Sequence, residues 1–147
     1  MPLTTLIVLL HFAATWAMVG LIWFVQTVHY PLFRRVGSAQ FRDYHNDHTS
    51  RIPWVVGPAM LVEGITATAL VFHRPPVLTQ TSVWLGMFLL VMIWVSTAVV
   101  QVPLHNLLAR GFDLRAYRRL VVTNWLRTIA WSLRGLLIMA MVGKQIR

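Results

Sequence analysis

Hydrophobic residues in this chain fall into four long runs separated by short polar stretches. The runs cover about residues 3–29, 52–73, 81–102 and 118–142. A helix needs about 20 mostly apolar residues to cross a bilayer, and within the bilayer it satisfies its own backbone groups. The pattern therefore predicts an all-α integral membrane protein. We expect one domain over residues 1–147, a bundle of four transmembrane helices.

The first polar stretch, residues 34–51, carries a second pattern. Phe41, Tyr44, His45 and His48 follow helical spacing and share one face. This spacing predicts a short amphipathic helix in the first loop, lying in the membrane interface.

Prolines are expected to shape the helices, because a proline inside a helix removes one backbone hydrogen bond. Pro31 is predicted to end the first helix, and Pro103 lies close to the end of the third. Pro53 and Pro58 are expected to bend or stiffen the second. In that helix, close contact with a neighbour is expected at two glycines, Gly57 and Gly64.

Composition and charge agree with this assignment. Hydrophobic residues make up 57% of the chain and charged residues only 12%. The net charge of +9 comes from arginines clustered between apolar runs, a distribution typical of membrane orientation rather than of nucleic-acid binding. There is no cysteine, which excludes disulfides, iron–sulfur clusters and thiol catalysis.

The arginines also predict an orientation. The loops after the first and third spans hold eight, and the opposite side holds only Arg74, Lys144 and Arg147. Because basic loops stay in the cytoplasm, we expect both termini on the non-cytoplasmic side, in a bacterial inner membrane. The eight arginines are Arg34, Arg35, Arg42, Arg51, Arg110, Arg115, Arg118 and Arg119.

Glu63 is the only glutamate, and it lies in the middle of the second span. Its predicted depth is roughly 16 Å, at 1.5 Å per residue. Arg127 in the fourth span is at a similar depth, so the two are predicted to pair. Such a pair either sets helix register as a structural contact, or relays protons and anchors a ligand. The other mid-membrane polar residues are His11, Thr15, Asn124 and Arg134, and we predict catalytic roles for Glu63, Arg127, Asn124 and His11.

Four of the six histidines are predicted to gather at the cytoplasmic face. They are His29, His45, His48 and His105, on three different segments. Together they could bind a transition metal such as Fe, Cu or Zn. The alternative is that they are interfacial histidines, hydrogen-bonded to headgroups and loop carbonyls. Haem is a third possibility, with His11 as ligand and His29 or His105 as its partner.

Two short segments in the second half of the chain form a recognisable pattern. They are Pro103, Leu104, His105, Asn106 and Leu108 after the third span, and Asn124, Arg127 and Thr128 in the fourth. With these residues the chain, mainly over residues 97–134, resembles the DUF1772 group of small four-helix membrane proteins, the anthrone oxygenase-like proteins. That family implies cofactor-poor or metal-assisted oxygenation of a hydrophobic aromatic substrate. His105 stands where the family usually has Asn. From Leu10–His11 the chain has a second resemblance, to haem-binding protoporphyrinogen oxidase-like proteins.

These features favour a membrane-embedded oxidoreductase, oxygenase-like, that acts on an apolar small molecule entering from the bilayer. Bound metal, haem or the substrate itself would supply the redox chemistry. The alternative is a non-enzymatic membrane protein: a transporter or channel subunit, or a lipid-binding partner with a structural Glu63–Arg127 pair. The expected partners are membrane lipids and a hydrophobic small molecule, not nucleic acid; assembly into a homo-oligomer is compatible with either hypothesis.

Overall fold

The computed structural model describes residues 2–146, and every regular element in that range is helical. The elements are α1 (Leu3–Phe24), the π-helix η1 (Val25–His29), α2 (Tyr30–Leu32), the 3-10 helix η2 (Phe33–Arg35), α3 (Ser38–Phe72), α4 (Gln80–Ser96), the π-helix η3 (Thr97–Gln101), α5 (Val102–Leu108) and α6 (Leu114–Ile146).

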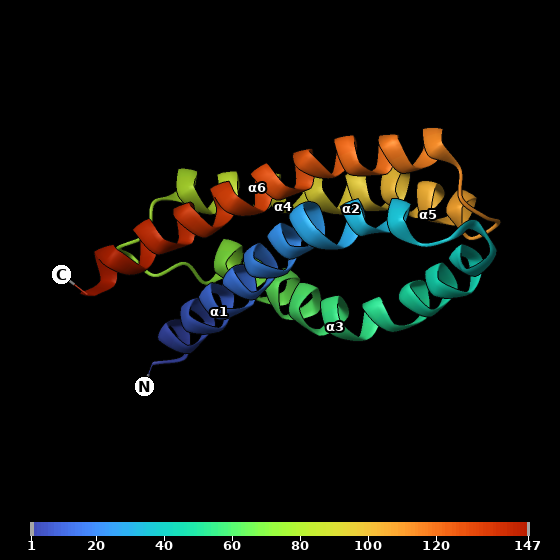
Figure 1. Ribbon diagram of the computed structural model, residues 1–147. Helices are drawn as coiled ribbons and strands as arrows, with labels where there is room; N and C mark the ends of the chain where they lie inside the picture. The colour runs from blue at the N-terminus through green and yellow to red at the C-terminus, as the bar shows by residue number, and fades with distance from the viewer. Residues whose placement is uncertain (1, 147) are drawn as a thin grey trace.

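These elements join into four long helical rods. Leu3–Arg35, Ser38–Phe72, Gln80–Leu108 and Leu114–Gly143 are all long and apolar enough to cross a membrane. Both chain ends and the connection between α3 and α4 lie at one end of the bundle (Figure 1). The other two connections lie at the opposite end, which we call the arginine-rich end. The four predicted helical segments are thus confirmed by length and composition.

The prediction that Pro31 ends the first helix was wrong. The helix continues through Pro31 to Arg35, and the third rod likewise continues through Pro103 to Leu108. In each rod a five-residue π-helix ends two residues before the proline. A proline ring clashes with the carbonyl four residues earlier. We attribute the wider π-turn to relief of that clash, which lets the rod continue.

The separate amphipathic helix was also a wrong prediction. Its residues form the first third of α3, which runs unbroken through Pro53 and Pro58. Phe41 and His45 are fully buried. Phe41 makes an edge-on contact with Phe33, at a ring-centroid distance of 6.0 Å. Phe41 and His45 on the predicted face therefore pack against the rest of the protein, while Tyr44 on the same face is exposed.

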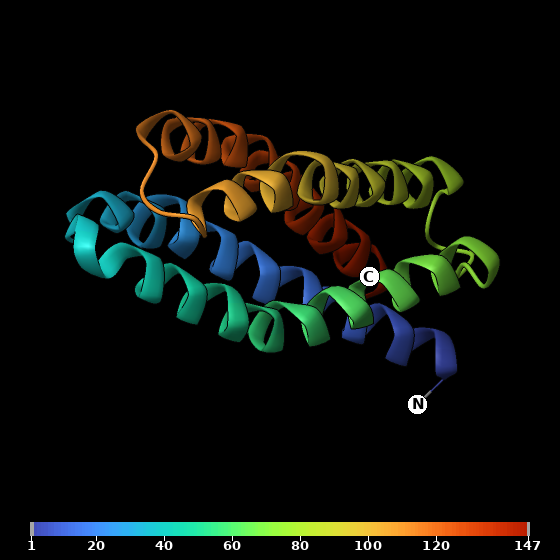
Figure 2. The ribbon, with the colours of Figure 1, turned by 90° about the vertical axis from the view of Figure 1, so that its right-hand side faces the viewer.

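The second rod, α3, bows away from the other three (Figure 1), and Figure 2 shows it running along one side of the bundle. Prolines inside a helix are a common cause of bending, and α3 contains two. Close packing onto α4 is confirmed at Gly64, where a Cβ would lie 2.9 Å from the Trp94 ring. At Gly57 nothing lies within 4 Å of an added Cβ, so the predicted close contact is absent there.

The turn between α5 and α6 follows the sequence signals. Gly111 has a φ of 142°, a conformation that side chains disfavour, and it lies just past the end of α5. Asp113 caps α6, since its Oδ1 accepts a bond of 2.6 Å from the Ala116 backbone N–H. This turn fixes where α6 begins and so which residues face the bundle interior.

Candidate functional site

Glu63 lies at the centre of a buried hydrogen-bond network. Its Oε1 accepts bonds of 3.0 Å from the Thr15 hydroxyl and 3.0 Å from Nε of Arg134. Its Oε2 accepts a bond of 3.1 Å from the indole N–H of Trp131. All four side chains are buried. Glu63 is therefore paired on both oxygens and turned towards the interior of the bundle.

The predicted pairing of Glu63 with Arg127 was wrong. The ion pair is made by Arg134, whose Nη2 lies 2.9 Å from Oε1 of Glu63. Arg127 and Arg134 are seven residues apart, about two turns, and occupy the same face of α6. Periodicity cannot distinguish them. Trp131 lies between the two arginines along α6, and its packing determines which arginine is level with Glu63.

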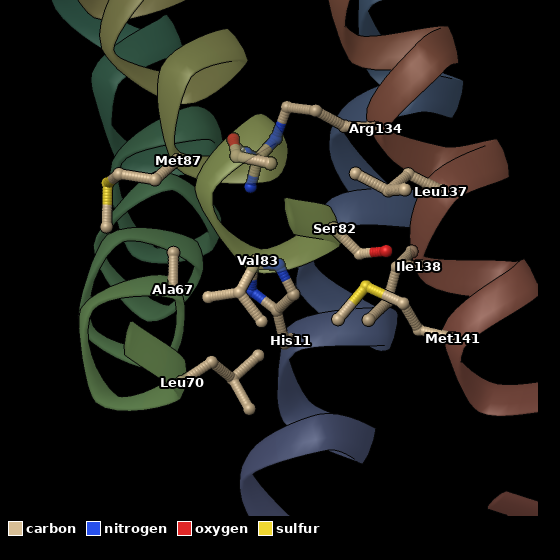
Figure 3. A pocket seen from close by; sticks show the side chains of 11 residues that line it. His11, Ala67, Leu70, Ser82, Val83, Met87, Arg134, Leu137, Ile138 and Met141 are labelled. Carbon is tan, nitrogen blue, oxygen red and sulfur yellow. Dashed lines mark hydrogen bonds between the residues drawn. The ribbon is translucent and has the colours of Figure 1, made fainter. Parts of the chain in front are cut away.

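His11 joins the same region from α1. Its Nδ1 lies 2.9 Å from the Thr66 hydroxyl, which itself donates to the Val62 carbonyl over 2.6 Å. The hydroxyl proton is thus used, so His11 Nδ1 is the donor. His11 and Arg134 both reach into a cavity of about 20 Å³ between α1, α3, α4 and α6 (Figure 3). That volume accommodates about one water molecule, so a haem on His11 does not fit this arrangement.

A second polar network lies nearer the arginine-rich end. Gln26 Nε2 donates to the Val121 carbonyl over 3.2 Å, and its Oε1 accepts from Asn124 Nδ2 over 2.8 Å. Asn124 Oδ1 in turn accepts from Arg127 Nη1 over 3.0 Å. Each amide is used at both ends, so the network holds the Arg127 side chain in one place.

Trp131 connects the two networks. The Arg127 guanidinium carbon lies 5.2 Å from the Trp131 ring centroid, within the range of a cation–π interaction. The same indole donates its N–H to Glu63. The residues expected to meet in one mid-membrane site therefore divide into two groups: His11 and Glu63 on one side of Trp131, and Asn124 and Arg127 on the other.

The four histidines His29, His45, His48 and His105 do come together at the arginine-rich end. His29 Nε2 lies 2.9 Å from His48 Nδ1, and His45 Nε2 lies 3.0 Å from His105 Nδ1. The rings of His48 and His105 are 5.6 Å apart, so the two pairs are neighbours. The segments that hold them are η1, α3 and α5.

Tyr30 extends one of the pairs into a chain of three. Its hydroxyl lies 2.9 Å from Nε2 of His105. The far end of this chain is Nδ1 of His45, which is buried without a partner among the described residues. Tyr30–His105–His45 is thus a continuous line of groups that can each accept and release a proton.

The arrangement of the four histidines differs from that of a metal site. Within residues 2–146, no group of three or more His, Cys, Asp or Glu side chains is arranged to hold a metal ion. The histidines bond to one another in pairs, and Tyr30 occupies the outer nitrogen of His105. In this arrangement their nitrogens do not converge on one point. The metal site remains a prediction that needs rearrangement of the side chains.

An apolar cavity of about 260 Å³ adjoins the histidines. This lies just below the range of about 300–1,000 Å³ typical of small-molecule sites. Apolar residues of α1 and α3 make up about half of its lining, including Met18, Ile22, Val56 and Met60. Its polar residues come from α2, α3, η3, α5 and α6: Tyr30, His48, Thr97, Gln101, His105 and Arg127.

Two polar atoms on residues of this cavity lack hydrogen-bond partners among residues 2–146. One is Nε of Arg127 and the other is Oε1 of Gln101. Gln101 Nε2 donates to the Thr123 hydroxyl over 3.0 Å, and that hydroxyl donates to the Arg119 carbonyl. The orientation of the Gln101 amide is thereby fixed. Buried polar groups without partners are uncommon and costly, which makes this cavity the strongest candidate site.

Tyr30 and Gln101 are site residues that the sequence analysis did not single out. A signal existed for both, because Tyr30 directly precedes Pro31 and Gln101 lies two residues before Pro103. π-turns often occur at functional sites, and a proline within an apolar run indicates where one can form. Trp131 follows the helical spacing of Arg127 and Arg134, but its bridging role has no sequence signal.

Fold and site together define a four-helix protein with membrane-compatible helices and a buried polar interior. Comparison of the chain with models of known protein families, with curated proteins and with solved structures finds no match. The resemblance to the anthrone oxygenase-like group is not tested by these comparisons and remains a hypothesis.

Proposed function

We propose that this protein is a membrane-embedded oxidoreductase, oxygenase-like, that binds an apolar small molecule in the 260 Å³ cavity. One observation carries the proposal: an apolar cavity ends against Tyr30, His105 and Arg127, two proton-transfer groups and a cation. The reaction class rests on the sequence resemblance, and the binding site rests on this geometry.

The polar end of the cavity suits removal of a proton from a bound molecule. His48 would take a proton from an acidic C–H or O–H group, or Tyr30 would take it while giving its own proton to His105. Arg127 would stabilise the resulting anion, since the described residues give it no carboxylate partner. In an oxygenase, dioxygen would then be the oxidant of that electron-rich anion.

The Glu63 network supports the site and does not carry the chemistry in this proposal. Glu63 holds the indole of Trp131, and the other side of that indole faces Arg127. Glu63 and His11 are thus positioning groups, while Arg127 and His105 contact the ligand. The proposed location is a bacterial inner membrane, with the arginine-rich end in the cytoplasm.

A non-enzymatic role is the second candidate. The observation that favours it is the completeness of the Glu63 network, in which every carboxylate oxygen is paired and buried. Such a network also fits a structural ion pair inside a small lipid-binding or transporter-associated protein.

Purification in mild detergent separates the two candidates. We expect an organic extract of the purified protein to contain a bound apolar molecule with an ionisable or carbonyl oxygen, identified by mass spectrometry. Incubation of the protein with that molecule should consume dioxygen, and Arg127→Gln should abolish the consumption. Release of membrane phospholipid alone, with no dioxygen consumed, would favour the second candidate.

A further inference from the structure

The 260 Å³ cavity, which we call the inner cavity, adjoins a hollow on the protein surface. This hollow of about 370 Å³ is lined by His29, Tyr44, Asp47, Arg51 and Val55, together with His48 and Ile52. The last two residues also line the inner cavity. His48 and Ile52 are therefore the partition between the inner cavity and the surface hollow.

The surface hollow reaches the solvent at the arginine-rich end. Asp47 and Arg51 form an exposed ion pair with an N–O distance of 3.9 Å, and their side chains are 73% and 81% exposed. The mouth of the surface hollow is therefore open to solvent. By contrast, the inner cavity is walled mainly by apolar side chains such as Met18, Ile22 and Met60.

The partition contains a bonded pair of imidazoles. His29 lines the surface hollow and not the inner cavity, and its Nε2 lies 2.9 Å from Nδ1 of His48. Nδ1 of His29 and Nε2 of His48 make no hydrogen bond to residues 2–146, and neither atom is fully buried. The pair thus has one open nitrogen at each end.

We propose that His29 and His48 form a proton port between the surface hollow and the inner cavity. A proton that binds Nε2 of His48 from a group in the cavity releases the proton on Nδ1 to Nε2 of His29, and Nδ1 of His29 then gives up its own proton to the surface hollow. One proton enters and one leaves, and a proton that returns by the same path restores the pair. Neutral imidazole suits this because one nitrogen accepts while the other donates.

Charged and titratable groups lie on both sides of the pair. On the surface side the hollow presents the exposed side chains of Asp47 and Arg51. On the inner side the next imidazole is His105, whose ring lies 5.6 Å from that of His48. The groups that face the port are Tyr44, Asp47 and Arg51 outside, and Tyr30, His45, His105 and Arg127 inside.

This inference rests on the proposed function, because it supplies the route by which a proton removed from a bound molecule reaches water. The test uses 4-nitrophenol, a small aromatic acid whose absorbance reports its protonation. Stopped-flow mixing changes the external pH, and the colour change of the bound probe is followed. Dilution at constant pH gives the rate at which the probe dissociates, which is the rate of any route that bypasses the port.

We expect bound 4-nitrophenol to change colour faster than it dissociates in the wild-type protein. In His48→Gln and His29→Gln the fast phase should be lost, and the colour change should fall to the dissociation rate. His73→Gln is the matched control, because it makes the same change at the opposite end of α3 and should keep the fast phase.

The possible failures are distinguishable. A fast phase that persists in both port variants overturns the port and leaves the cavity in place. A probe that binds the wild type no better than it partitions into detergent overturns the proposed function, and the port with it. Loss of the fast phase in His73→Gln as well would also overturn the port, since the effect would not be local.

Discussion

Glu63 and Arg134 form a buried ion pair with an N–O distance of 2.9 Å, and both side chains are almost completely inaccessible. Removing one member of a buried pair leaves the other charge uncompensated in a medium that solvates it poorly. The stability of the bundle therefore depends on keeping both residues, or on replacing both together.

This relationship predicts strong coupling between the two positions. Glu63→Gln and Arg134→Gln should each destabilise the protein by about 3–5 kcal/mol, and the double variant should recover part of the loss. A double-mutant cycle on the unfolding free energy in detergent measures the coupling. Arg127→Gln is the matched control, and coupling of Glu63 to Arg127 equal to that with Arg134 would contradict the observed pairing.

Trp131 is expected to act through its N–H as well as its ring. Trp131→Phe keeps an aromatic face beside Arg127 but leaves Oε2 of Glu63 without its 3.1 Å donor. An unpaired buried acceptor costs about 1–3 kcal/mol, so the melting temperature should fall. Trp84→Phe, at an exposed position on α4, should leave it unchanged. Equal melting temperatures for both variants would show that the indole N–H contributes nothing.

The hydroxyl of Tyr30 should determine which nitrogen of His105 carries the proton. In Tyr30→Phe the 2.9 Å contact with Nε2 of His105 is lost, so the tautomer balance of His105, and through it of His45, should change. Nitrogen-15 NMR of the labelled histidines measures this. The signals of His29 should not move. Identical His105 signals in the two proteins would mean that Tyr30 and His105 do not interact.

Metal removal tests the remaining metal prediction. Because the histidines already bond to one another in pairs, dialysis against a strong chelator should leave the melting temperature unchanged. Metal content and melting temperature are measured before and after. A near-stoichiometric loss of Fe, Cu or Zn accompanied by a lower melting temperature would show that the four histidines converge on a metal.

The rods were predictable because hydropathy and helix length are local properties of the sequence. The ends of the rods were not, because Pro31 and Pro103 have two structural solutions, a helix end or a π-turn, and tertiary packing selects between them. The same π-turns direct His29 and Gln101. Sequence spacing was sufficient to gather four histidines at one end, but not to show which nitrogens would meet.

The choice of ion-pair partner shows the same limit. Arg127 and Arg134 occupy one face of α6, and the energy difference between the two pairings arises from contacts across four helices, α1, α3, α4 and α6. Glu63 was identifiable as buried and paired from its chemistry alone, since a lone charge in an apolar span is costly. Its division from Asn124 and Arg127 depends on where Trp131 lies.

The most direct test of the account is an equilibrium titration with 4-nitrophenol. It compares the wild type with Met60→Trp, which fills the cavity, and with Met139→Trp, which adds the same bulk to an exposed face. We predict saturable binding to the wild type and to Met139→Trp, with the bound probe shifted towards its anion by Arg127, and no saturable binding to Met60→Trp. Equal binding by all three proteins would contradict the account, because the probe would then lie outside the cavity.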